Sequence, residues 1–466
     1  MKSSLLISVI VLFTFAPWAT FADTIHVPAD QPTIQAGIDA AVRGDIVLVA
    51  PGTYFENITF RGKKISVQGE AGVEETIIDG NNTGSVVRFW RGETEDSLIK
   101  GFTIRNGRFA LGGGISCVFA SPMISDCKII ENHSEGMGGG ILCLGSSPVI
   151  RDCTVFGNRA EPGVGMGGGI MCALSHAVIE NCQISYNKSY QYGSGIFCYY
   201  SSPTIRDSSI NDNSFYDHSL GDGGIALLGS SPLIANCEIK SNGEHVYAPT
   251  CGILCTLLSK PTITNCTISH NTADGISCQT FGNPVITNCT ITENSRWGID
   301  CEMYSFPRMT NCTISGNWDG GIYSYQSFPT MRNSILWGNA DPRECQYGID
   351  GGSIMSAGYS DMEGGHQQAC ISEDSTLLRL AGNIDADPLF VGADDYHLQG
   401  ASPCIDAGNP KASFMDACFP PSMGTERNDM GAYGGPGACD WPMDPDKKGV
   451  WLGALFSSEI TFQGRK

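Results

Sequence analysis

Positive charge is scarce in this chain: its 466 residues include 28 Lys and Arg against 48 Asp and Glu, a formal net charge of −20. This balance argues against a nucleic-acid partner, because the phosphate backbone requires a positive surface. Long apolar runs are also missing: beyond residue 15, no window approaches the roughly eighteen apolar residues of a membrane-spanning helix. Residues 111–340 lack a helical stripe of apolar residues, which excludes a helical fold for that region.

A short motif fills the middle of the chain instead. Gly-Ile-x-Cys, then Ser-Pro-x-Ile-x-Asn-Cys-x-Ile, then Asn recurs every 23–29 residues. Its Gly-Ile isoleucines are Ile115, Ile141, Ile170, Ile196, Ile225, Ile253, Ile276, Ile299 and Ile322. Self-similarity at such a period is typical of a solenoid, in which each repeat buries its apolar face against its neighbours.

Within each repeat, apolar residues alternate with small or polar ones, which is the periodicity of a β-strand. In the repeat that begins at Ile276, this alternation slips by one residue at Asn288. A slip without an inserted loop indicates a sharp corner, and Asn and Asp tolerate the left-handed backbone that a corner needs. Two columns of such residues follow the repeats: Asp126, Asp152, Asn181, Asp207, Asn236, Asn265, Asn288, Asn311 and Asn333, and Asn132, Asn158, Asn187, Asn213, Asn242, Asn271, Asn294, Asn317 and Asn339.

These features predict an all-β fold, a single-stranded parallel β-helix. Each coil would hold three short strands, and the chain is long enough for about 12 coils. Asn side chains stacked on successive coils would hydrogen-bond along the axis and satisfy corner backbone groups.

Most of the 20 cysteines fall on two inward columns of the predicted coils. These are Cys117, Cys143, Cys172, Cys198, Cys255, Cys278 and Cys301, and Cys127, Cys153, Cys182, Cys237, Cys266, Cys289 and Cys312. A free Cys behaves as a small buried hydrophobe, so we interpret both columns as core. Off the columns lie Cys251, Cys345, Cys370, Cys404, Cys418 and Cys439. The last five are disulfide candidates, and the sequence does not define their pairing.

The ends of the chain differ from its middle. Residues 1–22 hold an apolar run and end in small residues, so we interpret them as a secretory signal and predict an extracellular or cell-surface protein. Residues 23–110 should form a cap and the first coils, with an amphipathic helix over 32–42 and Thr33 as its N-cap. The apolar face of that helix would hold Ile34, Ile38, Ala41 and Val42. Residues 111–340 are expected to form the regular coils, 341–440 a module that closes the rod, and 441–466 a tail.

Three sets of phrases carry a family resemblance: Val27–Ile34 with Pro51–Tyr54, the Gly-Gly-Gly-Ile repeats with their terminal Asn, and Asp387–Phe390, Ser402–Gly408 and Asp429–Tyr433. Together they resemble bacterial right-handed parallel β-helix proteins of the pectin-lyase-like superfamily. The repeats are similar to those of polymorphic outer-membrane proteins, and the last three phrases to the terminal region of choice-of-anchor surface proteins. The resemblance implies a right-handed helix.

Catalytic signatures of that superfamily are missing. The Gln-Asp, Asp-x-x-Phe-Gly and Gly-Arg-Pro-Trp phrases of pectin methylesterases do not occur, and neither does the combined Asn-Thr-Asp, Asp-Asp, His-Gly and Arg-Ile-Lys set of polygalacturonases. No catalytic residue can therefore be carried over, and the sequence leaves open whether the protein is an enzyme.

One pair of carboxylates could support chemistry. Asp300 and Glu302 are one alternation apart and should project from the same face, about 6–7 Å apart. Aromatic residues that could bind a ligand lie in the same or neighbouring coils: Trp297, Tyr304, Trp318, Tyr323 and Tyr325. Paired carboxylates beside aromatic rings are typical of glycoside hydrolysis and of sugar binding. The simpler interpretation is a solvated acidic strand face.

Two further sets of residues are candidates. Outward positions of the early coils are apolar and include Leu142, Leu144, Met171, Phe197 and Tyr199. They would form either an exposed binding patch or a small second core under the neighbouring loops. Near the C-terminal end, Asp385, Asp387, Asp394 and Asp395 could hold Ca²⁺, although turn formation explains them equally simply. No other cofactor is predicted.

These observations favour a secreted, monomeric β-helix that presents a side face to an extracellular or cell-surface polysaccharide. One alternative is a polysaccharide lyase or glycoside hydrolase that acts around Asp300 and Glu302. The other is a surface adhesin or structural protein that binds protein partners. An enzyme should show a cleft with a perturbed titratable pair, and an adhesin an uncovered apolar or aromatic strip.

Overall fold

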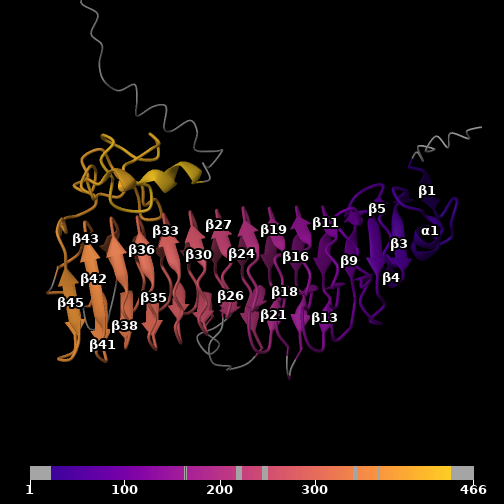
Figure 1. Ribbon diagram of the computed structural model, residues 1–466, viewed down its shortest axis with the longest axis horizontal. Coiled ribbons are helices and arrows are strands. Elements are labelled where there is room, and N and C mark those ends of the chain that lie inside the picture. Colours follow the sequence, from indigo (N-terminus) through magenta and orange to yellow (C-terminus); the bar gives the residue numbers. More distant parts are fainter. Residues whose placement is uncertain are drawn as a thin grey trace, which may run out of the picture.

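The computed structural model describes residues 22–441 apart from 162, 164, 217–222, 244–249, 340–344 and 366. It is an elongated rod in which parallel strands stack along the length of the molecule (Figure 1). Three long sheets wind around one interior in about 13 turns, which confirms the predicted parallel β-helix. The predicted signal and tail lie outside the described residues, apart from Ala22 and Trp441.

Each coil contributes one strand to each of three sheets, which we call A, B and C in chain order. Sheet A contains β1 (Thr24–Val27), β2 (Ile46–Val49), β5 (Ser66–Gly69), β8 (Leu98–Lys100), β11 (Met123–Ser125), β15 (Val149–Arg151), β19 (Val178–Glu180), β23 (Thr204–Arg206), β27 (Leu233–Ala235), β30 (Thr262–Thr264), β33 (Val285–Thr287), β36 (Arg308–Thr310), β39 (Thr330–Arg332), β42 (Ile354–Gly358) and β45 (Thr376–Arg379). Sheet B contains β3 (Gly52–Phe55), β6 (Thr76–Asp79), β9 (Thr103–Arg105), β12 (Lys128–Ile130), β16 (Thr154–Phe156), β20 (Gln183–Ser185), β24 (Ser209–Asn211), β28 (Glu238–Lys240), β31 (Thr267–Ser269), β34 (Thr290–Thr292), β37 (Thr313–Ser315), β40 (Ile335–Trp337) and β43 (Asp361–Met362).

Sheet C carries the side face discussed below. It contains β4 (Ile58–Thr59), β7 (Val87–Phe89), β10 (Ile115–Val118), β14 (Ile141–Leu144), β18 (Ile170–Ala173), β22 (Ile196–Tyr199), β26 (Gly223–Leu228), β29 (Cys251–Thr256), β32 (Ile276–Cys278), β35 (Trp297–Glu302), β38 (Gly320–Tyr325), β41 (Tyr347–Asp350) and β44 (Ala369–Ile371). A short fourth sheet adds β13 (His133–Ser134), β17 (Arg159–Ala160), β21 (Lys188–Ser189) and β25 (Ser214–Phe215) to the early coils.

The interior is lined by columns of isoleucine and cysteine. Cys117 pairs in register with Cys143, and the same column continues through Cys172 and Cys198. All fourteen cysteines of the two predicted columns are buried and free, which confirms that they belong to the core. Burial of each isoleucine contributes about 1.5–3 kcal/mol, so the stacked columns account for much of the stability of the rod.

Each coil turns at three corners. We call the corner between sheets A and B the amide corner, because its residues are the predicted column Asp126 to Asn333; all nine have a left-handed backbone, with φ between 48° and 55°. The second predicted column lies between sheets B and C and forms a buried ladder. Asn213, for example, donates from Nδ2 to Asn242 Oδ1 on the next coil at 3.1 Å and to Ile184 O at 2.9 Å. Both predicted columns are confirmed.

Helix α1 (Ile34–Ala40) covers the N-terminal coil. Thr33 caps it by accepting a hydrogen bond from Ala36 N at 3.0 Å, as predicted. Two further N–H groups of its first turn, those of Ile34 and Gln35, donate to the carboxylate of Glu56. The helix is shorter than expected, and Val42 is 62% exposed, so its place on the apolar face was wrong.

The C-terminal module lies on the side of the rod, over the amide corner of the late coils (Figure 1). Asn288 Nδ2 donates to Ala432 O, and Asn311 Nδ2 donates to Asp429 O at 2.9 Å. A small apolar cluster that includes Ile335 and Met430 lies beneath it. The module contains the short helices η1 (Ala412–Phe414) and η2 (Pro436–Asp440). Residues 341–440 also contain the last coil strands, β41 to β45, and closure of the end of the rod by this region stays a prediction.

Among the five disulfide candidates, two pairs form: Cys345–Cys370 and Cys418–Cys439. Cys404 is buried and forms no disulfide, so the expectation for Cys404 was wrong, and the sixth off-column cysteine, Cys251, is also buried. In the part of the chain that the structure describes, no helix is long and apolar enough to cross a membrane.

Candidate functional site

The predicted carboxylates lie on β35, on the outer side of sheet C. Asp300 is in register with Ser277 of β32 and with Tyr323 of β38, and Glu302 is in register with Tyr325. Glu302 is half-buried, whereas Asp300 is only 5% exposed. A solvated acidic face therefore does not describe Asp300. We call Asp274, Arg296, Asp300, Glu302, Tyr323 and Tyr325 the carboxylate–tyrosine face.

Burial dominates the electrostatics of this face. It raises the pKa of Asp300 well above the usual range of a carboxyl, the charges of Asp274 and Glu302 raise it further, and Arg296 opposes them. Asp300 Oδ1 is buried and has no hydrogen-bond partner among the described residues. Burial likewise raises the pKa of Asp274 to about 6, against the nearby charge of Arg296. Arg296 Nη1 lies 3.6 Å from Asp274 Oδ2. A carboxyl that stays protonated near neutral pH beside a second carboxylate could act as a general acid.

The aromatic candidates do not share one environment. Trp297 is buried and stacks on Tyr323, with ring centroids 5.3 Å apart, so it packs the face rather than exposing a ring. Burial and the charge of Asp350 raise the pKa of Tyr323 to about 12. Trp318 is 65% exposed and lines a separate hollow of about 410 Å³ with Glu293 and Gly316.

Tyr304 and Tyr325 present exposed rings next to Glu302. The Tyr304 ring stacks on Phe281 of the preceding coil at 5.8 Å, and the Tyr325 ring covers Gly351 of the following coil. Tyr199, on β22, is 40% exposed and lies four strands away from β35 in sheet C. Its ring packs edge-on against Tyr200 at 4.7 Å. The structure thus pairs Tyr325 with Glu302, places Tyr304 two residues after Glu302 at the end of the same strand, and leaves Tyr199 further along the rod.

The early apolar positions form a second core. Leu142, Met171 and Phe197 are buried in one cluster with Ala226 and Leu254. Tyr192 covers the cluster by stacking on Phe197 at 5.5 Å. Of the two alternatives, the exposed patch was wrong for these three residues, because neighbouring turns fold over them.

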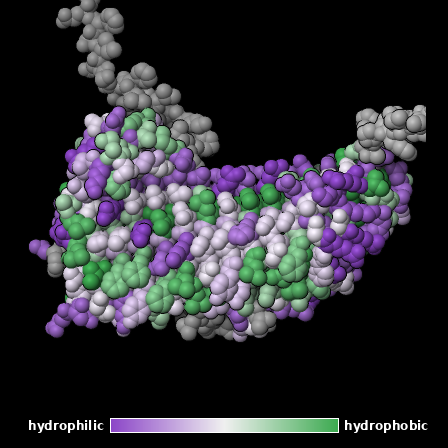
Figure 2. Space-filling model, in the orientation of Figure 1, coloured by the Kyte–Doolittle hydropathy of each residue, from purple (hydrophilic) through white to green (hydrophobic). Residues whose placement is uncertain are grey.

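Exposed apolar residues also occur one residue further along the coil, just after the sheet C strands. Directly after the last paired position of the sheet C strands, ten consecutive coils have a residue with a left-handed backbone, with φ between 43° and 61°. We call this column, between sheets C and A, the apolar corner. Its members are Phe119, Gly145, Leu174, Tyr200, Gly229, Leu257, Thr280, Met303, Gln326 and Gly351. Its five large apolar side chains are all exposed, from 43% for Leu257 to 72% for Phe119. Figure 2 shows apolar residues as separate patches among polar ones over the middle and late coils, whereas the N-terminal end is mostly hydrophilic.

Rings on this corner cover glycines of the next coil. A Cβ on Gly145 would lie 2.6 Å from the Phe119 ring, and one on Gly229 would lie 2.7 Å from the Tyr200 ring. Where one coil has an aromatic residue at this corner, the next coil therefore needs glycine at the equivalent position. Sequence reasoning missed it because it searched the strands for outward residues. The signal was present as glycine at three of ten equivalent positions directly after the Gly-Ile-x-Cys strand.

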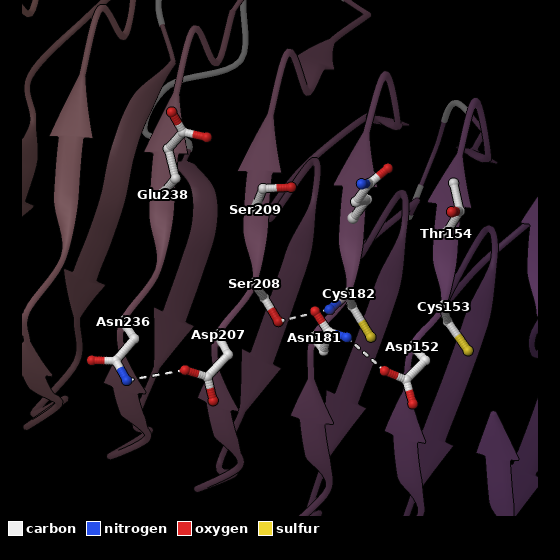
Figure 3. Close-up of a pocket in the computed structure, with 11 residues that line it drawn as sticks. Asp152, Cys153, Thr154, Asn181, Cys182, Asp207, Ser208, Ser209, Asn236 and Glu238 are labelled. Atoms are coloured by element: carbon white, nitrogen blue, oxygen red, sulfur yellow. Dashed lines mark hydrogen bonds between the residues drawn. The ribbon is translucent and has the colours of Figure 1, made fainter. Parts of the chain in front are cut away.

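The amide corner forms a shallow hollow where the C-terminal module does not cover it (Figure 3). Its volume is about 510 Å³, and Asp152, Asn181, Asp207 and Asn236 line it together with Glu238. These side chains already pair along the axis: Asn181 Nδ2 donates to Asp152 Oδ1 at 2.6 Å, and Asn236 Nδ2 donates to Asp207 Oδ1 at 3.0 Å. The hollow is polar and carries no aromatic ring.

The calcium candidates act mainly in turns. Asp385 accepts a hydrogen bond from Gly364 N, Asp387 from Leu389 N, and Asp395 from His397 N. Within the described ranges, no group of three or more His, Cys, Asp or Glu side chains could hold a metal ion. Binding of Ca²⁺ by these residues and by Asp394 stays a prediction.

Three stacked parallel sheets with one strand of each per coil define a protein of the parallel β-helix class. More specifically, the chain belongs to the family described as "Right handed beta helix region", whose model matches residues 45–231 and 204–361. No curated protein sequence matches the chain. The further resemblance to choice-of-anchor surface proteins stays a prediction.

Several solved structures are similar in fold. One is the A-module of a mannuronan C-5 epimerase from Azotobacter vinelandii, at 17% identity and a TM-score of 0.39, covering 76% of this chain and 94% of that one. Another is an alginate lyase from a Paenibacillus species, at 14% identity and a TM-score of 0.39, covering 66% and 99%. A third is a mannuronic acid-specific polysaccharide lyase from human gut microbiota, at 13% identity and a TM-score of 0.36, covering 67% and 86%.

Proposed function

We propose that this protein is a secreted β-helix that binds polysaccharide at the carboxylate–tyrosine face. The observation that carries the proposal is the position of Glu302 on β35, in register with the exposed Tyr325 of the next coil and two residues before the exposed Tyr304. An aromatic ring offers a flat apolar surface to the C–H groups of a sugar, and a carboxylate accepts hydrogen bonds from its hydroxyls. Tyr323, beside them in register with Asp300, adds a further phenol group.

The burial of Asp300 supports binding rather than cleavage. Glycoside hydrolysis needs two carboxyl groups that both reach the scissile bond. Asp300 is 5% exposed, and its Oδ1 is enclosed. Only Glu302 of the pair is open to a ligand lying on the face.

The proposal can be tested by affinity electrophoresis in gels that contain soluble polysaccharides. Tyr304→Ala and Tyr325→Ala should each weaken retention about fivefold, because a ring contact contributes about 1 kcal/mol. Trp318→Ala is the matched control, since this exposed ring lies in a different hollow. Equal retention of wild type and all three variants would refute the proposal. Binding of a protein ligand alone would favour the adhesin alternative.

A catalytic role is the second candidate, favoured by the raised pKa of Asp300 and its unpartnered oxygen. Here Asp300 would act as the general acid and Glu302 as base or nucleophile, in a conformation that uncovers Asp300. Incubation with a panel of neutral and uronic-acid polymers tests this alternative. New reducing ends or unsaturated products that disappear in Asp300→Asn would support it. Retained binding with no product would exclude it.

A further inference from the structure

We infer that the ligand contact continues from the carboxylate–tyrosine face along the whole apolar corner, so that an electrically neutral polysaccharide lies parallel to the axis of the rod. This inference rests on the proposed function. It adds a second, longer binding surface, made of Phe119, Leu174, Tyr200, Leu257 and Met303.

Backbone conformation does not explain the residues on this corner. A left-handed backbone costs an L-residue about 1–2 kcal/mol, and Gly, Asn and Asp are the residues that tolerate it. The amide corner meets this requirement with Asp or Asn in all nine coils. The apolar corner has the same backbone in ten coils but uses glycine in three and Asn or Asp in none. Seven residues there are therefore held in an unfavourable conformation.

Burial does not explain them either. Phe119, Leu174 and Tyr200 are 72%, 63% and 55% exposed, and packing of the two rings is limited to the glycine of the next coil and, for Tyr200, to an edge contact with Tyr199. Strained, exposed apolar residues at five of these ten positions indicate a surface kept for a ligand.

The rings are arranged at regular intervals. Phe119 and Tyr200 follow β10 and β22, which are three strands apart in sheet C, and Phe281, which follows β32, comes three strands later. At about 4.8 Å per strand, the interval is about 14 Å. The Phe281 ring then stacks on Tyr304, which joins the corner to the carboxylate–tyrosine face. A ligand that touches every ring must run along the axis.

The charge along this strip identifies the class of polymer. Two residues after the left-handed position, the early coils carry exposed Ser147, His176, Ser202 and Ser231, which can hydrogen-bond sugar hydroxyls. Lys260 continues this row in the next coil, while Glu302 and Asp350 lie on its sheet C side. A polyuronate would need a series of cations, and it would also be repelled by the net charge of −20. A neutral glycan needs no cations on the surface and is not repelled by the net charge of the protein.

Affinity electrophoresis against neutral glucomannan and against alginate tests this inference. Phe119→Asn and Tyr200→Asn should each lower the affinity for long glucomannan chains about fivefold, without lowering the melting temperature. Tyr186→Asn is the matched control: Tyr186 is also 55% exposed and left-handed, with φ of 56°, but lies on the corner between sheets B and C. Short glucomannan oligosaccharides should respond to Tyr325→Ala but not to Tyr200→Asn.

The possible outcomes separate this inference from the proposed function. If Tyr325→Ala weakens binding while Tyr200→Asn behaves like Tyr186→Asn, the extended corner site is wrong and the proposed function stands. Tighter binding of alginate than of glucomannan refutes the neutral ligand. If no glycan binds, both proposals fail. If wild type dimerises in sedimentation experiments and Tyr200→Asn is monomeric, without glycan binding, the corner is a self-association surface and the inference is overturned.

Discussion

The amide corner and the apolar corner turn the same chain through the same left-handed backbone with opposite kinds of residue. Asp and Asn at the amide corner relieve backbone strain and bind their neighbours, as Asn181 does with Asp152. Large apolar residues at the apolar corner do not relieve backbone strain, and Phe119 and Leu174 remain mostly exposed. Backbone conformation alone therefore explains the residues at the amide corner. The residues at the apolar corner meet a further requirement, which we attribute to ligand binding.

The amide corner itself has two parts. Over the late coils, Asn288 and Asn311 donate to backbone carbonyls of the C-terminal module and are buried. Over the earlier coils, Asp152 and Asn181 are exposed and line the open hollow. The same side-chain amides therefore serve as a docking strip where a partner segment is present.

The largest effect is expected when a large apolar residue, of the kind found at the apolar corner, replaces an Asn of the amide corner that the C-terminal module covers. Asn311→Leu should lower the free energy of unfolding by about 2–4 kcal/mol, because it strains a left-handed position and removes the donor to Asp429 O. Urea unfolding measures this loss, and faster trypsin cleavage within residues 385–441 should accompany it. Asn181→Leu, at the exposed part of the corner, should lose only about 1–2 kcal/mol. Equal losses would contradict the docking role.

A change of pH should act on the face where the apolar corner meets the carboxylates. The folded pKa of Asp274 is raised to about 6, so the folded protein binds more protons than the unfolded chain between about pH 4 and 6. The contribution of Asp274 to the free energy of unfolding is therefore most favourable below about pH 4 and falls by roughly 2 kcal/mol as the pH rises to 6.

Urea midpoints between pH 4 and 8 measure this dependence. Asp274→Asn should flatten the decrease, and Asp152→Asn, at an exposed position of the amide corner, should leave it unchanged. A decrease of the same size in Asp274→Asn would assign it to other carboxyls, such as Asp416, whose pKa is raised by burial to about 7.

A smaller effect is expected from replacing a glycine that lies under an aromatic ring. Gly229→Ala should cost about 1–2 kcal/mol, because φ is 59° and a Cβ would lie 2.7 Å from the Tyr200 ring. Gly157→Ala, at φ of 64° on the corner between sheets B and C, should cost about 1 kcal/mol from backbone strain alone, since its nearest neighbour is 4.0 Å away. Only Gly229→Ala should also weaken glucomannan binding. If both variants bind equally well, the ring position is irrelevant to the ligand.

The sequence identified the corners that use Asn because that residue is itself the one that tolerates the backbone there. It identified the cysteine columns because strand alternation fixes which side chains point inward. Alternation does not reveal what a neighbouring coil places over an outward residue, so it missed the burial of Asp300 and of Phe197. Nor does spacing determine which cysteines meet in an irregular segment, as Cys404 illustrates.

The smallest effect has the opposite sign and separates the two corners most directly. Tyr200→Asn should raise the free energy of unfolding by about 1 kcal/mol, because the relief of backbone strain at φ of 43° exceeds the loss of the ring contacts with Tyr199 and Gly229. The gain in the urea midpoint should come together with weaker glycan binding. A residue that serves the fold loses stability when it is replaced, so a stabilised variant with impaired binding means that Tyr200 is kept for its ligand. A destabilised variant would mean that the ring supports the coil through its contact with Gly229, and the contrast between the corners would then reflect packing alone.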